Sequence, residues 1–369
     1  MYRTTLSLFL LLFAFSCNEM SSETTSQTKE EIAPTDSKKV SLKYPEEKNF
    51  KTLRQLTNGG DNAEAYFSFG NDELVLQVTN KEWGLECDQI FHLPLDTPKG
   101  QKLKMLSTGK GRTTCSYFMP GDSTILYAST HKGGDGCLDA PRSVDGKYVW
   151  SIFDTYDIYE ADLEGNIIRA LTDGEGYDAE ATVSPDGKKI VFTSTRSNDL
   201  ELYTMDIDGS NVKQVTNELG YDGGAFFSPD SKQLVFRASR PTSEEDIKNY
   251  KHFFDQGLVQ PTNMEIFVCD VDGQNMKQIT NLGGANWAPF FHPSGEKIIF
   301  ASNHHTDSRR VFNLFSTNLD GTELKQITFD NTFDSFPMFS FDGKYFVFSS
   351  NRNNGGGRDT NVFLAEWID

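Results

Sequence analysis

The side chains best suited to chemistry in this sequence recur at a fixed spacing, in two columns of six. Members of the first column stand six residues before a turn of the Ser-Pro-Asp-Gly type: Asn62, Thr113, Asp178, Asp222, Asn286 and Asp334. Members of the second column follow a short apolar run: Asn80, His131, Arg196, Arg240, His304 and Arg352. Aspartate can accept hydrogen bonds from hydroxyls or hold a cation, and arginine can bind a carboxylate or a sugar.

Two interpretations of the columns stay open at this point. In the first, each arginine pairs with an aspartate of its own or the next repeat and fixes the loops, because ion-pair networks are often structural. In the second, the columns form a polar ligand site, to which Glu64 and Glu180 add further carboxylates. Trp287 adds a ring that can stack on a sugar or a peptide side chain, or can simply pack between repeats.

No familiar catalytic or nucleotide-binding motif accompanies the columns. The sequence has no Gly-x-Ser-x-Gly nucleophile motif and neither of the two common glycine-rich phosphate loops. The Asp-Gly pairs at 208–209, 272–273 and 320–321 lack the spacing of calcium ligands and are typical of hairpin turns. We therefore predict no catalytic residue, no metal and no cofactor, and a binding protein in preference to an enzyme.

A repeated unit of four short strands positions both columns, and residues 177–216 show it most clearly. An apolar strand leads to the Ser-Pro-Asp-Gly turn at 184–187, and a β-branched run follows at 189–193. A third strand at 201–207 is closed by Asp-Gly, and a fourth lies at 212–216. The first turn, the third strand and the fourth-strand ending each occur six times. We predict an all-β fold, a six-bladed β-propeller of four-stranded antiparallel blades.

The six copies are offset in a way that predicts how the ring closes. A fourth-strand sequence at 51–57 precedes any complete unit, and the last third strand, 361–367, has almost nothing after it. We expect the N-terminal strand to supply the outer strand of the last blade, which removes an open sheet edge. Trimming residues 51–57 should then destabilise the fold far more than trimming residues 18–45.

The turn, the strand ending in Thr-x-Arg, the Tyr-x-Met-Asp-x-Asp-Gly strand and the Leu/Val-Thr ending resemble the propeller repeats of TolB-like proteins. The resemblance covers residues 51–369 and implies the fold, whereas this repeat serves many functions. TolB itself carries a further N-terminal domain that has no counterpart here. A TolB-like role implies non-catalytic binding of a protein, peptide or glycan in the cell envelope.

Oligogalacturonate lyases carry related repeats, which gives an alternative function. In these enzymes several propeller histidines hold a divalent metal, so the resemblance implies a metal-dependent polysaccharide lyase or hydrolase. The histidines available here are His131, His292, His304 and His305, and His292 occupies a turn that should lie on the opposite face. The lyase fold also has seven blades, where the landmarks predict six.

Two insertions should lie on the face that carries the columns. Residues 131–150 extend the second blade and are rich in glycine. Residues 241–260 extend the fourth blade and predict a short amphipathic helix, with Ser243 as its N-cap and Gly257 at its end. Such a helix can cover part of the channel mouth or dock a partner.

The cysteines allow one disulfide in the propeller. Cys87, Cys115 and Cys137 fall near one another in the repeat scheme, and the sequence leaves their pairing open. A metal bound by these residues with His131 and nearby aspartates is conceivable, but the spacing matches no standard zinc pattern. Cys269 lies in a strand and is expected to be a buried free thiol.

The N-terminus indicates export. Arg3, the apolar residues 6–15 and Cys17 have the form of a signal peptide, 1–17, with a lipobox-like end, so Cys17 is the expected lipidation site. Residues 18–50 are poor in apolar side chains and predict a disordered tether. The protein is thus expected in the periplasm or outer membrane of a bacterium as a lipoprotein. Its net charge of −18 disfavours nucleic acid as a partner, and the sequence does not indicate an oligomeric state.

Overall fold

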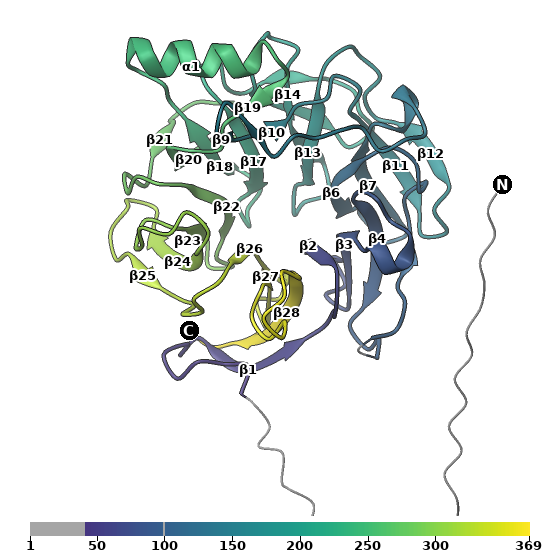
Figure 1. Cartoon of the computed structure of the whole chain (residues 1–369), viewed down its shortest axis with the longest axis vertical. Helices are drawn as coiled ribbons and strands as arrows, with labels where there is room; N and C mark the ends of the chain where they lie inside the picture. Colours follow the sequence, from purple (N-terminus) through teal and green to yellow (C-terminus); the bar gives the residue numbers. More distant parts are fainter. Residues whose placement is uncertain (1–40, 99) are drawn as a thin grey trace, which may run out of the picture. The chain divides into compact units, whose positions relative to one another are not determined.

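Six four-stranded antiparallel sheets are arranged around a common axis in the computed structural model of the protein, which describes residues 41–98 and 100–369 (Figure 1). The first strand of each sheet lies nearest the axis and the fourth lies at the rim. The structure therefore confirms the predicted six-bladed β-propeller.

Each blade consists of strands that follow one another along the chain. Blades 1 to 3, from the axis outward, are: β2 (Asp61–Phe67), β3 (Glu73–Thr79), β4 (Gln89–Pro94) and β5 (Lys104–Met105); β6 (Thr113–Phe118), β7 (Thr124–Ser129), β11 (Asp157–Asp162) and β12 (Ile167–Ala170); β13 (Asp178–Val183), β14 (Lys189–Ser194), β15 (Glu201–Asp206) and β16 (Lys213–Gln214). Blades 4 to 6 are: β17 (Asp222–Phe227), β18 (Gln233–Ser239), β20 (Met264–Asp270) and β21 (Lys277–Gln278); β22 (Asn286–Phe291), β23 (Lys297–Ser302), β24 (Asn313–Asn318) and β25 (Lys325–Gln326); β26 (Asp334–Phe339), β27 (Tyr345–Ser350), β28 (Asn361–Trp367) and β1 (Phe50–Gln55).

The first turn of each blade is stabilised by residues of the turn itself. In blade 3, the hydroxyl of Ser184 donates to Asp186 at 2.7 Å and accepts the backbone N–H of Lys189 at 2.9 Å. Gly187 adopts a φ of 70°, a conformation that costs glycine little because it has no Cβ. The turn therefore reverses the chain within four residues and sets the register of β13 on β14.

The second strand of each blade is buried on both faces, because neighbouring blades pack against it from either side. In β14, Ile190, Val191 and Phe192 are consecutive and all are fully buried. Such a strand reads as a continuous β-branched and aromatic run instead of alternating with polar residues. Burying each of these side chains contributes about 1.5–3 kcal/mol.

The ring closes between the two ends of the folded chain. β1 pairs antiparallel with β28, with Leu53 opposite Ala365 and Gln55 opposite Phe363. Phe50 is fully buried and its ring lies 5.6 Å from that of Phe348. The predicted closure by the N-terminal strand is confirmed.

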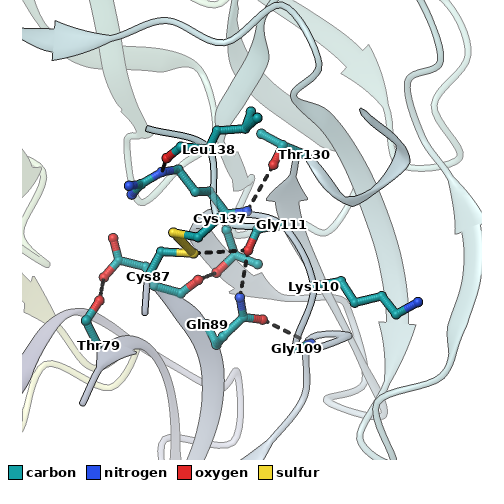
Figure 2. The surroundings of a disulfide bond; sticks show 12 residues. Thr79, Cys87, Gln89, Gly109, Lys110, Gly111, Thr130, Cys137 and Leu138 are labelled. Carbon is teal, nitrogen blue, oxygen red and sulfur yellow. Dashed lines mark hydrogen bonds between the residues drawn. A yellow bond between two sulfur atoms is a disulfide. The ribbon is translucent and has the colours of Figure 1, made fainter. Parts of the chain in front are cut away.

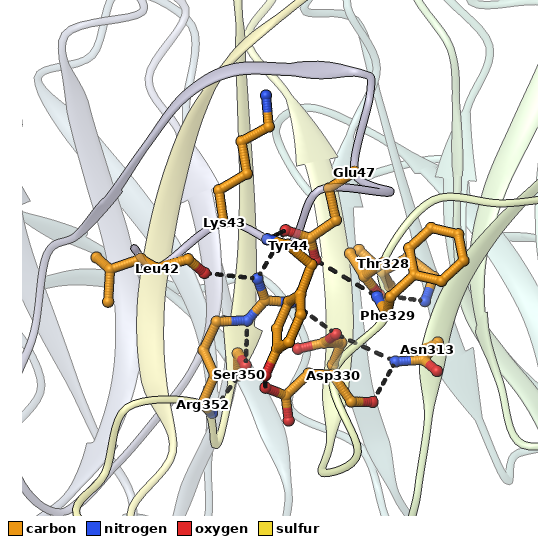
Figure 3. Close-up of polar contacts among 12 residues, drawn as sticks. Leu42, Lys43, Tyr44, Glu47, Asn313, Thr328, Phe329, Asp330, Ser350 and Arg352 are labelled. Atoms are coloured by element: carbon orange, nitrogen blue, oxygen red, sulfur yellow. Dashed lines mark hydrogen bonds and ion pairs between the residues drawn. The ribbon is translucent and has the colours of Figure 1, made fainter. Parts of the chain in front are cut away.

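The folded unit begins at Ser41, ahead of residue 51 where the repeat alone would start it. Glu47 is fully buried and forms an ion pair of 2.9 Å with Arg352 (Figure 3). The hydroxyl of Tyr44 donates to Asp330 at 2.6 Å. Residues 41–50, which composition assigns to the tether, thus pack on the last blades, and residues 18–40 lie outside the described part of the chain.

The remaining elements lie in the connections between blade strands. They are: the 3-10 turns Lys81–Trp83 and His131–Gly133, β8 (Ser143–Val144), β9 (Lys147–Tyr148), β10 (Trp150–Ser151), α1 (Glu244–Phe254) and β19 (Leu258–Val259). Among residues 41–98 and 100–369, no helix has the length and apolar character needed to cross a membrane.

We expect the seam to dominate stability at the N-terminus. A chain that starts at Leu56 lacks β1, exposes the edge of β28 and leaves the pocket of Phe50 empty. It should lose at least about 3 kcal/mol of unfolding free energy relative to a chain that starts at Ser41. Chemical denaturation of the two truncated proteins measures this difference, and equal midpoints would show that the seam is not needed.

Candidate functional site

The two columns of polar residues form hydrogen bonds with each other inside the blades. Arg196 donates to Asp178 at 2.8 Å, Arg240 to Asp222 at 2.9 Å and Arg352 to Asp334 at 2.9 Å, each pair within one blade. The same bond joins the first and second strands in all three blades. Arginine and aspartate in these columns are therefore partners of each other, as the first of the two interpretations holds.

The histidines of the second column are also held within their blades. His131 Nδ1 lies 3.0 Å from Ser129 Oγ, and His304 Nδ1 lies 2.7 Å from Ser302 Oγ. The Ser302 hydroxyl donates to Asn286 at 2.6 Å, which links the two columns in blade 5. No member of either column lines the cavity described next.

A cavity of about 440 Å³ lies at the mouth of the channel on the face that carries both insertions. All six innermost strands contribute to its wall, together with the first insertion. Its lining residues are: Glu64, Tyr66, Gln77, Asp88, Thr114, Cys115, Tyr148, Trp150, Ser151, Ile152, Tyr156, Tyr177, Glu180, Thr182, Tyr221, Gly224, Phe226, Arg237, Trp287, Ala288, Phe333 and Phe336. The predicted site residues that the structure brings together here are Glu64, Glu180 and Trp287.

A β-bulge in every innermost strand builds the ring at the base of this cavity. At each bulge the register against the second strand shifts by one residue. A residue of left-handed φ occupies the shift in each blade: Glu64 (51°), Cys115 (41°), Glu180 (57°), Gly224 (58°), Ala288 (47°) and Phe336 (54°). A bulge re-aims a side chain out of the ladder, and all six of these residues line the cavity.

The ring residues of blades 1 to 3 differ in polarity from those of blades 4 to 6. Blades 1 to 3 place Glu64, Cys115 and Glu180 in it, whereas blades 4 to 6 place Gly224, Ala288 and Phe336 there. The cavity therefore has a polar arc and an apolar arc, although the backbone is the same in all six blades. Left-handed φ at a non-glycine residue costs free energy, so five of the six ring positions are strained, and Gly224 is the exception.

Glu180 is the most completely bonded group of the polar arc. It accepts hydrogen bonds from the Tyr221 hydroxyl at 2.7 Å, the Thr193 hydroxyl at 2.8 Å and the backbone N–H of Gly224 at 3.0 Å, and it pairs with Arg237. Burial alone would raise the pKa of this carboxyl, but Arg237 and the hydroxyl donors outweigh burial and lower the pKa. Glu180 is therefore ionised.

Arg237 occupies the space that a side chain at the blade 4 bulge would fill. A Cβ on Gly224 would overlap its Nη1 atom, so glycine is needed there. The guanidinium also lies 4.9 Å from the ring of Tyr221 and 5.4 Å from that of Trp150. Sequence reasoning missed Arg237, although an arginine inside the buried strand Gln233–Ser239 is a signal that something buried must neutralise it.

Glu64 has a different environment from Glu180. The Cys115 thiol donates to its Oε2 at 2.9 Å and the Tyr66 hydroxyl donates to the same atom at 3.3 Å. Within the described residues its Oε1 has no hydrogen-bond partner. Burial raises the pKa of Glu64 to about 7, against the lowering effect of the thiol and with added repulsion from Glu180.

The two insertions meet over the cavity and form a cap. β10 pairs with β19, with Trp150 opposite Val259, and the N–H of Ile152 donates to Gly257 at 2.7 Å. Helix α1 begins at its expected N-cap, where Ser243 accepts the N–H of Asp246 at 3.0 Å. In this way the second-blade insertion places the cap residues Tyr148, Trp150 and Ile152 in the cavity wall.

A disulfide joins the cap to blade 1 (Figure 2). Cys87 precedes β4 and Cys137 lies in the first insertion, with their Cα atoms 6.0 Å apart. Arg112 holds the same insertion by donating to the carbonyl of Leu138 at 2.7 Å. Cys115 and Cys269 are free, and burial raises the pKa of both thiols.

The histidines do not converge on the cavity. His292 lies in a first turn on the opposite face, where it is 3.1 Å from Asp369. His304 and His305 pack on Phe315, and none of these three lines the cavity. Within the described ranges, no group of three His, Cys, Asp or Glu side chains is placed to hold a metal ion.

A closed ring of six blades, a ring of β-bulges and a capped cavity on the axis define the described part of the chain as a β-propeller. Residues 145–252 and 258–359 match the family model described as the TolB beta propeller domain, which is more than half of the chain. The protein belongs to the TolB β-propeller domain family.

Solved structures agree with this assignment at the level of the fold. A TolB-type protein from Agrobacterium tumefaciens is 18% identical with a TM-score of 0.54, over 84% of this chain and 91% of that one. TolB from Acinetobacter baumannii is 19% identical with a TM-score of 0.51, over 83% and 63%. Oligogalacturonate lyase from Vibrio parahaemolyticus reaches 12% identity and a TM-score of 0.48, over 85% and 93%. For the two TolB-type structures, identities this low show the fold alone.

The column arginines should differ widely in their effect on stability. Arg352 is 3% exposed and serves two fully buried carboxylates, Glu47 and Asp334, so Arg352→Ala should cost about 3–5 kcal/mol. Arg196 is 32% exposed and serves a single carboxylate, Asp178, which is 7% exposed, so Arg196→Ala should cost less, about 1–2 kcal/mol. Urea unfolding of both variants measures the costs, and similar values would contradict the structural role assigned to the buried triad.

Stability should depend on pH through Glu64. Its pKa rises from an ordinary 4.5 to about 7, so between these values the folded protein holds a proton that the unfolded chain has released. Stability from this group is present at low pH and is lost as pH rises through 7. Glu64→Gln should therefore gain stability over the native protein as pH rises from 5 to 8, by roughly 1–3 kcal/mol. Unfolding at several pH values tests this, with Glu245→Gln on α1 as the exposed control.

Proposed function

We propose that this protein is a non-catalytic binding propeller of the cell envelope, which holds part of a protein, peptide or glycan partner in the capped cavity. The observation that carries the proposal is the cavity itself, which combines aromatic walls with polar groups that have no partner. Pockets of this volume with a few convergent polar groups are typical ligand sites.

The unpartnered groups are those a ligand would need. Tyr156 and Tyr177 are 6% and 5% exposed and both line the cavity, yet neither hydroxyl forms a hydrogen bond within the described residues. Neither hydroxyl is among the buried side-chain atoms without a partner, so both are accessible from the cavity and free to bond a ligand. A bound ligand would supply these partners. Trp150 and Trp287, whose rings lie 5.4 Å apart, line the cavity as well, with Trp287 stacked on Phe312 at 4.4 Å.

Export and lipid anchoring are also part of the proposal. They are supported by the signal-like residues 1–17 and by Cys17 at their end. Both lie outside the described residues. Mass spectrometry of the protein from its native membrane fraction tests lipidation, which should be lost in Cys17→Ala.

One observation favours the catalytic alternative, a polysaccharide hydrolase or lyase. Glu64 near neutrality and ionised Glu180 line the same cavity, and a pair of carboxyls with separated pKa values is a pattern of acid–base catalysis. Glu180, however, accepts from four donors and has no oxygen left for a substrate or a water molecule. Turnover of an oligosaccharide that is abolished in Glu64→Gln would overturn the non-catalytic proposal, and elemental analysis would show whether a metal takes part.

Photo-crosslinking in intact cells should locate the binding face. A photoreactive phenylalanine analogue at Tyr148, which is 54% exposed at the cavity, should form adducts with the partner. The same residue at Lys188, which is 77% exposed in a first turn on the opposite face, should form none of these adducts. Identical adducts from both positions, or none from Tyr148, would contradict the proposed site.

A further inference from the structure

We infer that the group held in the cavity is a cation, an alkylammonium supplied by a small amine or by a lysine side chain, with Glu64 as its counter-ion. The inference rests on the proposed binding function and specifies the chemistry of the ligand. Three observations support it: the balance of charge among the cavity residues, the aromatic rings in the cavity wall, and the oxygen atoms of the wall that have no hydrogen-bond partner.

The cavity wall contains more negative than positive charge. Its ionisable acids are Glu64, Asp88 and Glu180, and its one basic side chain is Arg237. Arg237 forms an ion pair with Glu180 through Nη2, while its buried Nε has no hydrogen-bond partner within the described residues. Burial raises the pKa of Asp88, although it accepts a hydrogen bond from Thr79 and the charges of Arg112 and Arg142 lower its pKa. Within the described residues, Glu64 and Asp88 are the two cavity carboxyls that form no ion pair, and of these Glu64 is the one in the bulge ring.

The strands near β2 do not supply Glu64 with an unpaired positive charge. β6 presents the Cys115 thiol to Glu64, β13 presents Glu180, and β18 presents Arg237 from across the ring. Two charged groups of the other strands are already paired: Asp334 of β26 with Arg352 and Glu366 of β28 with Lys51. Glu73 of β3 lies 3.2 Å from the His92 ring nitrogen Nε2. β27, whose sequence is Tyr-Phe-Val-Phe-Ser-Ser, has no charged side chain.

The uncharged part of the wall suits an organic cation. Aromatic rings attract ammonium groups through their negative faces. Arg237 already lies over two tyrosine and tryptophan rings of the wall, Trp150 and Tyr221, and five more line the cavity: Tyr66, Tyr148, Tyr156, Tyr177 and Trp287. The free hydroxyl oxygens of Tyr156 and Tyr177 can each accept a hydrogen bond from an ammonium. With Oε1 of Glu64 they give three acceptors, which is the number of N–H donors on a primary ammonium.

Binding of such a group is coupled to a proton. A cation beside Glu64 favours the carboxylate and lowers its pKa, so a protonated Glu64 must release its proton when the ligand binds. Affinity should rise with pH up to about 7 and become constant above it. Near pH 7 about half a proton should be released for each ligand bound.

The experiment titrates the purified full propeller with n-butylammonium chloride and with its neutral analogue n-butanol. Two capped tripeptides, Gly-Lys-Gly and Gly-norleucine-Gly, repeat the comparison for a peptide. Tryptophan fluorescence reports binding because Trp150 and Trp287 line the cavity. The charged probes should bind and the neutral ones should not. Tighter binding of the lysine peptide would point to a peptide ligand, and equal binding of both charged probes to a free amine.

Glu64→Gln should weaken binding of the charged probes by at least about tenfold, as expected when a charge-assisted hydrogen bond is lost. Glu245→Gln, an exposed change on α1, should leave it unchanged. Calorimetry of the native protein in two buffers of different ionisation enthalpy measures the released proton without any substitution, which guards against misfolding of the variant.

Three results would overturn the inference: neutral probes that bind as well as charged ones, Glu64→Gln that binds normally, or binding without proton release near pH 7. If a neutral or acidic glycan binds in the cavity instead, the cation is excluded and the proposed binding function stands. If no probe binds and Tyr148 gives no adducts in cells, both fail.

Discussion

Each innermost strand of the propeller has one residue more than its neighbour can pair with, and this mismatch turns a side chain out of the ladder toward the axis. The cavity depends on it. Without the bulge, strict alternation would direct these side chains between the blades, into the packing that Phe192 and its equivalents already fill. The bulge costs local strain at Glu64, Cys115, Glu180, Ala288 and Phe336. That strain is held in place by a ring that is closed at the seam of β1 and β28.

The sequence predicted the fold well because its signals are local and repeated. A turn such as 184–187 needs no distant partner, and six copies of three landmarks overdetermine the number of blades. The site was predicted only in part. Glu64, Glu180 and Trp287 were identified from their position near the first column, but the column residues brace the blades instead of lining the cavity.

What the sequence did not show depends on contacts between distant segments. The bulge shifts the side-chain alternation by one residue, and alternation is the rule by which a strand is read. The two insertions, which belong to the second and fourth blades, pair with each other through β10 and β19. No local sequence pattern predicts this pairing. Glu47 resembles any other acid in a charged segment, and only the partner Arg352 explains its burial. Arg237 was the exception, since an arginine within an apolar strand is visible beforehand.

The bulge ring also separates architecture from chemistry. The backbone is alike in all six blades, so a change of side chain at one of the six ring positions leaves the strand pairing around it intact. Blade 4 shows how far this extends: its ring residue is glycine, and an arginine from the neighbouring strand fills the vacant place. The propeller is thus one scaffold on which the side chains at the ring positions outside blade 4 can vary. A lineage, or a protein engineer, can change what the cavity recognises one position at a time without redesigning the scaffold.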